Sequence, residues 1–211
     1  MIVNSLRGLV KSAGGRLPGC STASFRTRAG ASIPATLADA AGPLLEQVEA
    51  LSRNIAGMDR LIAQLAARYP EIERLRTVPG VGPVVAATYA LTLDGKDKIR
   101  RSRQAGAFLG LRPRQSQSGD SDPQNRIAKT GNVYLRSLLV QAAQYVLGRF
   151  GPDSELRRWG LKLAASGGKR GKKRAIVAVA RKLAVILHRM WQTGDRWRAF
   201  PQAAGKPAQI A

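Results

Sequence analysis

Apolar residues recur every seven positions in the stretch between residues 36 and 69. One series, at the d positions of a heptad, consists of Leu37, Leu44, Leu51, Met58 and Leu65. The other, offset by four at the a positions, consists of Ala41, Val48, Ile55 and Ile62. This repeat is typical of a coiled coil, and Pro43 predicts that the continuous helix starts near it. We therefore predict a coiled coil over 35–70 whose residues 44–65 join copies of the chain into a homo-oligomer; an amphipathic helix packed within one chain is the alternative.

Shorter periodic segments flank this helix. Residues 2–12 place apolar side chains on one helical face, whereas 13–34, rich in Gly, Ser, Thr and Pro, are predicted to form a loop. Apolar spacing predicts further helices at 71–77, 83–93, 102–110, 132–149, 153–165 and 172–191. Proline, glycine and polar residues predict that 111–131 are mostly loop.

The pattern as a whole predicts a mainly α fold, in which a long coiled-coil helix leads into a compact helical domain with a helix-hairpin-helix-like turn. The predicted parts are a helix and loop over 1–34, the coiled coil over 35–70, the compact domain over 71–197 and a disordered tail over 198–211. No apolar run approaches the roughly 18 residues that a membrane-spanning helix needs, so no membrane is expected among the partners.

The charge balance points to a polyanionic partner. The 211 residues contain 35 Lys and Arg against 13 Asp and Glu, for a formal net charge of +22. Nucleic acid is the expected partner, because each Lys or Arg that meets a phosphate releases condensed counterions. Cys20 is the one cysteine and His188 the one histidine, which excludes an intrachain disulfide and a cysteine-based zinc site. The N-terminus lacks a signal-peptide core, so we expect a cytoplasmic, nucleoid-associated bacterial protein.

A glycine-rich turn, Val-Pro-Gly-Val-Gly-Pro from Val78 to Pro83, precedes the predicted helix 83–93. A tight turn at a helix N-terminus presents free backbone N–H groups, which bind a phosphate with the help of the helix dipole. We therefore predict that Gly80 and Gly82 bring the backbone close to DNA. The alternative is a helix connector that binds nothing.

A strongly basic loop follows. Nine basic and two acidic residues lie between Lys98 and Arg136. DNA-backbone contacts are predicted for Arg112, Arg114, Arg126, Lys129 and Arg136. Ser116 and Ser118 lie in the middle of this field, but a serine attacks phosphorus only when a base accepts its proton, and the local sequence supplies none. A flexible polar loop that holds a phosphate backbone is the alternative to a nucleophilic serine.

Another basic stretch, residues 157–189, contains eleven basic residues and no acidic ones. Nucleic-acid contacts, with a solvated basic face as the alternative, are predicted here for Lys169, Arg170, Lys172, Lys173 and Arg174. At least two of the three tryptophans, Trp159, Trp191 and Trp197, are expected to be buried. His188 is expected to be structural or exposed, and not catalytic.

Several segments, taken in this order, resemble a known family. They are Thr77–Pro83, Leu109–Pro113, Gln117–Gly119, Arg126–Asn132 and Leu135–Arg136. Together they resemble the C-terminal transposase domain of the insertion-sequence 110/116/902 family, over roughly residues 72–160. The segment 2–14 resembles the last helix of the family's RNase-H-like domain, and the heptad region resembles the coiled coil that mediates subunit assembly.

This resemblance implies a mechanism. A serine of the C-terminal domain attacks the DNA backbone and forms a phosphoserine link, and the matching position is Ser118, with Ser116 as the second choice. A structured guide RNA pairs with target and donor DNA. Acidic positions in an upstream domain bind Mg²⁺; no Asp or Glu precedes Asp39, so no metal and no cofactor are expected to bind this chain alone.

The leading hypothesis is therefore a truncated transposase that binds DNA as an oligomer, together with RNA, and does not cleave it alone. A non-enzymatic helix-hairpin-helix module that binds nucleic acid is the first alternative. A basic RNA-binding protein with no role on DNA is the second.

Overall fold

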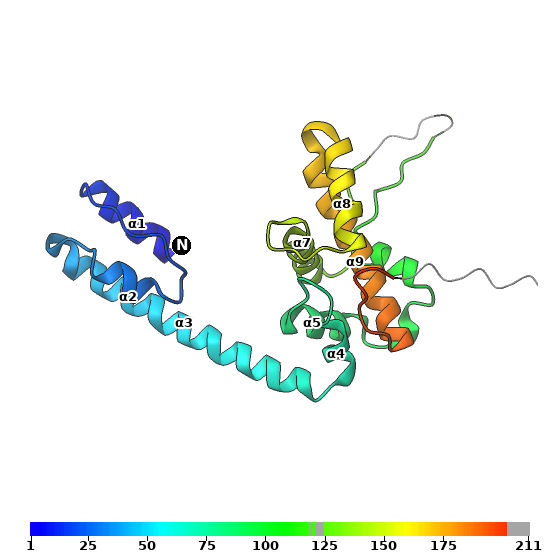
Figure 1. Ribbon diagram of the computed structural model, residues 1–211, viewed down its shortest axis with the longest axis horizontal. Helices are drawn as coiled ribbons and strands as arrows, with labels where there is room; N and C mark the ends of the chain where they lie inside the picture. Colours follow the sequence, from blue (N-terminus) through cyan, green and yellow to red (C-terminus); the bar gives the residue numbers. More distant parts are fainter. Residues whose placement is uncertain (119, 121–124, 202–211) are drawn as a thin grey trace, which may run out of the picture. The chain divides into compact units, whose positions relative to one another are not determined.

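The computed structural model describes residues 1–118, 120 and 125–201 (Figure 1). The chain divides into two compact units, Met1–Ala63 and Gln64–Ala211. Within the described residues the ordered elements are helices, and Pro113 and Ile127 form an isolated antiparallel bridge. The predicted mainly α fold is confirmed. None of the described helices combines the length and the apolar character of a membrane-spanning segment.

The first unit is a small helical cluster. It contains α1 (Ile2–Ser12), α2 (Phe25–Gly30), η1 (Ala35–Leu37) and most of α3 (Ala38–Ala67). Its core consists of Leu6, Val10, Leu17, Phe25, Ala29, Ala41 and Val48. The prediction that 13–34 is all loop is wrong at α2. Phe25 and Ala29 stand four residues apart on one helical face, and their complete burial stabilises a helix too short to show a periodic pattern.

Helix α3 begins at Ala38 and contains Pro43, so the predicted start near Pro43 is wrong. Proline removes one backbone donor, and in the second turn of a helix this costs a single hydrogen bond. Burial of Ala41 and Val48 on either side of it offsets that loss.

The heptad stripe of α3 changes its surroundings midway. Ala41 and Val48 are buried in the first unit. Further along the same stripe the apolar side chains are 48 to 64% exposed; these are Leu51, Ile55, Met58 and Leu65. The first part of the repeat is therefore used within the chain, and the second part presents an uncovered apolar stripe.

Helix α9 (Gly171–Thr193) is the central element of the second unit. The helices that pack against it are α4 (Pro70–Leu75), α6 (Ala105–Phe108), α7 (Val133–Leu147) and α8 (Glu155–Ser166). The remaining elements are α5 (Pro83–Leu93) and the 3₁₀ turns η2 (Lys96–Lys98), η3 (Ser102–Gln104) and η4 (Gly168–Arg170). Ala175, Ala180 and Ala184 are fully buried on α9, and their small side chains permit close helix contacts.

Polar side chains buried on this axis make hydrogen bonds to neighbouring elements, and within the described residues His188 Nε2 is left without a partner. The Tyr89 hydroxyl of α5 donates to the Ala184 carbonyl of α9 at 2.6 Å, and burial raises the pKa of Tyr89. His188 is fully buried, and its Nδ1 lies 3.1 Å from the Ser102 hydroxyl. Burial lowers the pKa of His188, so the neutral imidazole is favoured and its role is structural.

Only one of the three tryptophans is buried, so the expectation of at least two is wrong. Trp191 is 8% exposed, whereas Trp159 and Trp197 are half-buried and pack against the edge of the same core. A large indole at the margin of a core covers core surface with one face and leaves the other outside.

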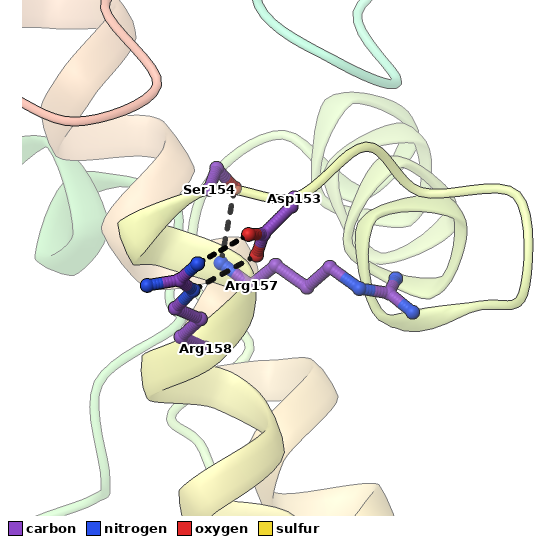
Figure 2. Close-up of polar contacts among 4 residues, drawn as sticks. All are labelled: Asp153, Ser154, Arg157 and Arg158. Carbon is purple, nitrogen blue, oxygen red and sulfur yellow. Dashed lines mark hydrogen bonds and ion pairs between the residues drawn. The ribbon is translucent and has the colours of Figure 1, made fainter.

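The start of α8 is fixed by side chains (Figure 2). The Ser154 hydroxyl accepts a hydrogen bond from the Arg157 backbone N–H at 3.2 Å and caps the helix. Asp153 accepts two hydrogen bonds from the Arg158 guanidinium, which holds the pKa of Asp153 below its usual range. The Arg157 guanidinium donates to the carbonyls of Val146 and Gly148 at the end of α7. This joint sets the direction in which α8 leaves α7.

Candidate nucleic-acid interface

The loop that contains both candidate serines is closed at its base by a stem of two hydrogen-bonded backbone segments. Three backbone hydrogen bonds join its two sides: Lys129 to Gly110 at 3.1 Å, Ala128 to Arg112 at 2.9 Å and Arg114 to Arg126 at 2.9 Å. The stem is thus a short antiparallel ladder within the predicted loop 111–131.

Two glycines allow the backbone segments at the foot of the stem to touch. Gly110 and Gly131 have φ angles of +65° and +74°. A Cβ on Gly131 would lie 2.2 Å from the Phe108 carbonyl oxygen, and one on Gly110 would lie 2.4 Å from the backbone of Thr130. Both positions exclude any side chain. They are essential to the site's geometry, although the sequence alone indicated no structural role for them.

Arg136 lies beneath the same crossing. Its side chain is 8% exposed, and its Nη1 donates to the carbonyls of Leu109 at 3.1 Å and Thr130 at 2.7 Å. One guanidinium nitrogen therefore ties both sides of the stem together. Arg136 was predicted to contact DNA, whereas in the structure its buried guanidinium positions the stem.

The other predicted loop residues lie on the surface. Ser116 and Ser118 are exposed beyond the ladder, and the exposed cations at the stem are Arg112, Arg114, Arg126 and Lys129. Such a group of cations attracts a phosphate backbone and stabilises charge on an oxyanion close to a hydroxyl. The chain's single histidine is buried beside Ser102, so the loop has no imidazole to take a serine proton.

The two glycines of the glycine-rich turn, Gly80 and Gly82, have different roles. The Val81 N–H donates to the Val78 carbonyl at 3.0 Å, and Gly80 has φ +81°, which defines a type II turn with Pro79 at its second position. A Cβ on Gly80 would lie 2.8 Å from the Ala142 carbonyl oxygen of α7. Gly80 therefore serves packing, whereas exposed Gly82, the N-cap of α5, faces open space.

The third basic group lies at the start of α9. The exposed residues are Arg170, Lys172, Lys173 and Arg174, and the Lys169 side chain lies outside the described part of the structure. No acidic residue is present in the first turn of this helix. Cations there are disfavoured by the helix dipole, so their concentration is not explained by helix stability and is typical of an anion-binding surface.

Within the described residues, no three side chains of His, Cys, Asp or Glu come together in a way that could hold a metal ion. Carboxylate oxygens are the protein ligands that Mg²⁺ prefers, and the described residues present no ready-made cluster of them for the metal that the family resemblance implies.

These features define a basic helical domain built around a single braced loop. Residues 72–158, which include the glycine-rich turn, the serine loop and α7, match the family model described as Transposase IS116/IS110/IS902 family. These residues therefore form a domain of that transposase family, and the chain as a whole is similar to transposases.

Several transposases are similar to the chain. The transposase for insertion sequence element IS1111A of Coxiella burnetii is 30% identical over 208 residues, which cover 93% of this chain and 55% of that protein. A probable family 20 transposase of Pseudomonas aeruginosa is 33% identical over 117 residues, 56% of this chain and 35% of that protein. The transposase for insertion sequence element IS1328 of Yersinia enterocolitica is 36% identical over 120 residues, 56% and 34% of the two chains. The chain thus spans from about a third to just over half of these relatives.

The glycine crossing can be tested with Gly131→Ala. We expect a loss of about 3 kcal/mol in the free energy of unfolding, because the new Cβ meets the Phe108 carbonyl oxygen in addition to the strain of a positive φ. Gly168→Ala is the matched control: its φ is +59° but its surroundings are open, so a loss of only about 1 kcal/mol is expected. Urea denaturation measures both, and equal losses would contradict the close crossing.

Proposed function

We propose that this chain is the serine-bearing, nucleic-acid-binding part of a transposase and acts in DNA transposition. The observation that carries the proposal is the exposed Ser118 in a loop whose stem is braced by backbone pairing and bears exposed cations. Family membership supports the same function. A second serine on the same loop, Ser116, is the fallback nucleophile.

In the proposed reaction, the Ser118 Oγ attacks a DNA phosphorus. A P–O bond forms to the serine, the P–O bond to one bridging oxygen breaks, and the serine proton passes to a base while the leaving oxygen ends as a hydroxyl. One phosphodiester replaces another, so no external energy source is needed. Arg112, Arg114 and Arg126 stabilise the charge that develops on the phosphoryl oxygens.

The chain alone binds nucleic acid without cleaving it, in this proposal. The proton acceptor is not the single histidine, which is buried beside Ser102. The acidic domain implied by the family resemblance supplies the acceptor, and Mg²⁺ belongs to that domain. DNA and a structured guide RNA are the proposed partners, and the net charge of +22 suits both.

A non-enzymatic DNA-binding module is the second candidate. The exposed Gly82 at the N-terminus of α5 favours it, because a phosphate can approach the first turn of that helix without meeting a side chain. The two candidates share the binding surface and differ in whether a covalent intermediate forms.

The covalent step is tested by trapping. The chain is incubated with radiolabelled DNA and Mg²⁺, with and without a separately expressed acidic domain from a longer relative, and resolved by denaturing electrophoresis. We expect a protein–DNA adduct only when the acidic domain is present, lost in Ser118→Ala and kept in Ser116→Ala. An adduct that survives Ser118→Ala would reject this residue as the nucleophile, and persistent absence of any adduct would favour the binding module.

The basic stem is tested by neutralising Arg112, Arg114 and Lys129 to Gln. Each phosphate that no longer meets a cation should reduce the slope of log affinity against log salt by about 0.9, so the three changes together flatten it by about 2 to 3. Arg53, Arg60 and Arg68, exposed on or next to α3, give a control with the same change in net charge. Duplex binding by fluorescence anisotropy is the measurement, and an equal effect in both variants would contradict a local interface.

The exposed half of the heptad stripe is proposed to join copies of the chain. Ile55 and Met58 are 59% and 64% exposed, so changing both to Asp leaves the buried cores intact and places charge in the seam. We expect light scattering to show a smaller mass. Asn54→Asp with Ala56→Asp is the control off the stripe, and an unchanged mass for the first pair would reject the coiled coil as the oligomer interface.

A further inference from the structure

A groove of about 480 Å³ lies between α8, α9 and the segment that follows α9. It belongs wholly to the second unit, and none of the residues placed above at the serine loop lines it. Its volume is in the range of small-ligand sites, which is about 300 to 1,000 Å³. It is too small for a duplex and large enough for one nucleotide.

The outer wall of the groove is fixed in place at three points. The Gly194 N–H donates to the Met190 carbonyl at 2.9 Å and ends α9. The Trp197 N–H donates to the Thr77 hydroxyl after α4 at 3.2 Å. The Glu155 N–H at the start of α8 donates to the Ala199 carbonyl at 2.9 Å. The predicted disordered tail, 198–211, begins in this wall; its residues 202–211 lie outside the described part of the structure.

The floor of the groove is apolar. It is formed by Leu156, Ile186, Met190 and Trp197. Leu156 and Met190 belong to the buried core, and Ile186 and Trp197 pack against it from the groove side. An indole with aliphatic neighbours offers a rigid apolar surface on which the flat face of a base can lie.

The rim is mainly cationic. Its basic residues are Lys182, Arg189, Arg196 and Arg198, and its acidic residues are Glu155 and Asp195. The Lys182 Nζ lies 4.4 Å over the ring of Trp159, and the three arginines are exposed. No ion pair involves these arginines in the described part of the chain. Their guanidinium groups therefore remain available to phosphate oxygens.

We propose that this groove binds an unstacked nucleotide of single-stranded nucleic acid. The base lies on the apolar floor beside Trp197, and the flanking phosphates meet Arg189 and Arg196 at the rim. The carboxylates of Glu155 and Asp195 accept hydrogen bonds, so they favour bases that carry amino groups. The inference rests on the proposed function in one respect: it takes the partner to be nucleic acid. It assigns single strands to a surface separate from the serine loop.

Fluorescence anisotropy with a short single-stranded oligonucleotide and the matching duplex tests the assignment. We expect Arg189→Gln with Arg196→Gln to weaken single-strand binding by about tenfold and to leave duplex binding within about twofold. The matched control is Arg53→Gln with Arg60→Gln, which removes the same charge from α3. Equal weakening of both ligands, or equal effects in variant and control, would overturn the proposal.

Photo-crosslinking locates the nucleotide without any change in the protein. A single strand that carries 5-bromouracil is irradiated with the unmodified chain, and the attached peptide is identified by mass spectrometry. We expect attachment at Trp197, and attachment confined to the loop 111–131 would overturn the proposal. The serine loop is tested independently by the duplex measurements on Arg112, Arg114 and Lys129, so a failure of the groove is distinguishable from a failure of the proposed function.

Discussion

The second unit depends on the burial of one face of α9. Val179, Leu183 and Leu187 are fully enclosed there by helices that come from distant parts of the sequence. Burying three such side chains contributes roughly 5 to 9 kcal/mol, comparable to the net stability of a whole domain. Helices α4 and α6 are six and four residues long, too short to be stable in isolation, so their form is set by this contact. The serine loop and the groove both start from elements that α9 holds.

Backbone contacts at the base of the serine loop determine its position. Two glycines let the chain cross itself, and the buried Arg136 satisfies a carbonyl on each side of the crossing. A buried carbonyl without a hydrogen-bond donor would destabilise the fold, so the guanidinium is held in place by the two carbonyls that it satisfies. The exposed cations of the stem do not take part in this bracing and face the solvent. The buried arginine therefore holds the loop in position, and the exposed arginines give its surface a positive charge.

Periodicity was sufficient to predict most of the helices, because burial of one face imposes a spacing that the sequence displays directly. The predicted segment 83–93 coincides with α5, and 172–191 lies within α9. Prediction failed where tertiary contacts override local preference, at α2 and around Pro43. The number of charged residues identified the basic regions of the chain. It cannot distinguish a cation that faces solvent from Arg136, which donates to two carbonyls. The groove was beyond prediction because its walls come from α8, α9 and residues after α9.

The burial of Arg136 has an electrostatic consequence. Mobile ions in solution screen an exposed charge within about 10 Å at moderate salt, but they do not enter the space around a buried one. Its guanidinium meets two neutral carbonyls, so its full positive charge persists under the foot of the loop. Salt therefore weakens the attraction between this guanidinium and its two carbonyl partners very little. High ionic strength weakens the attraction of the exposed lysines and arginines for any polyanion, but it leaves this internal brace of the loop in place.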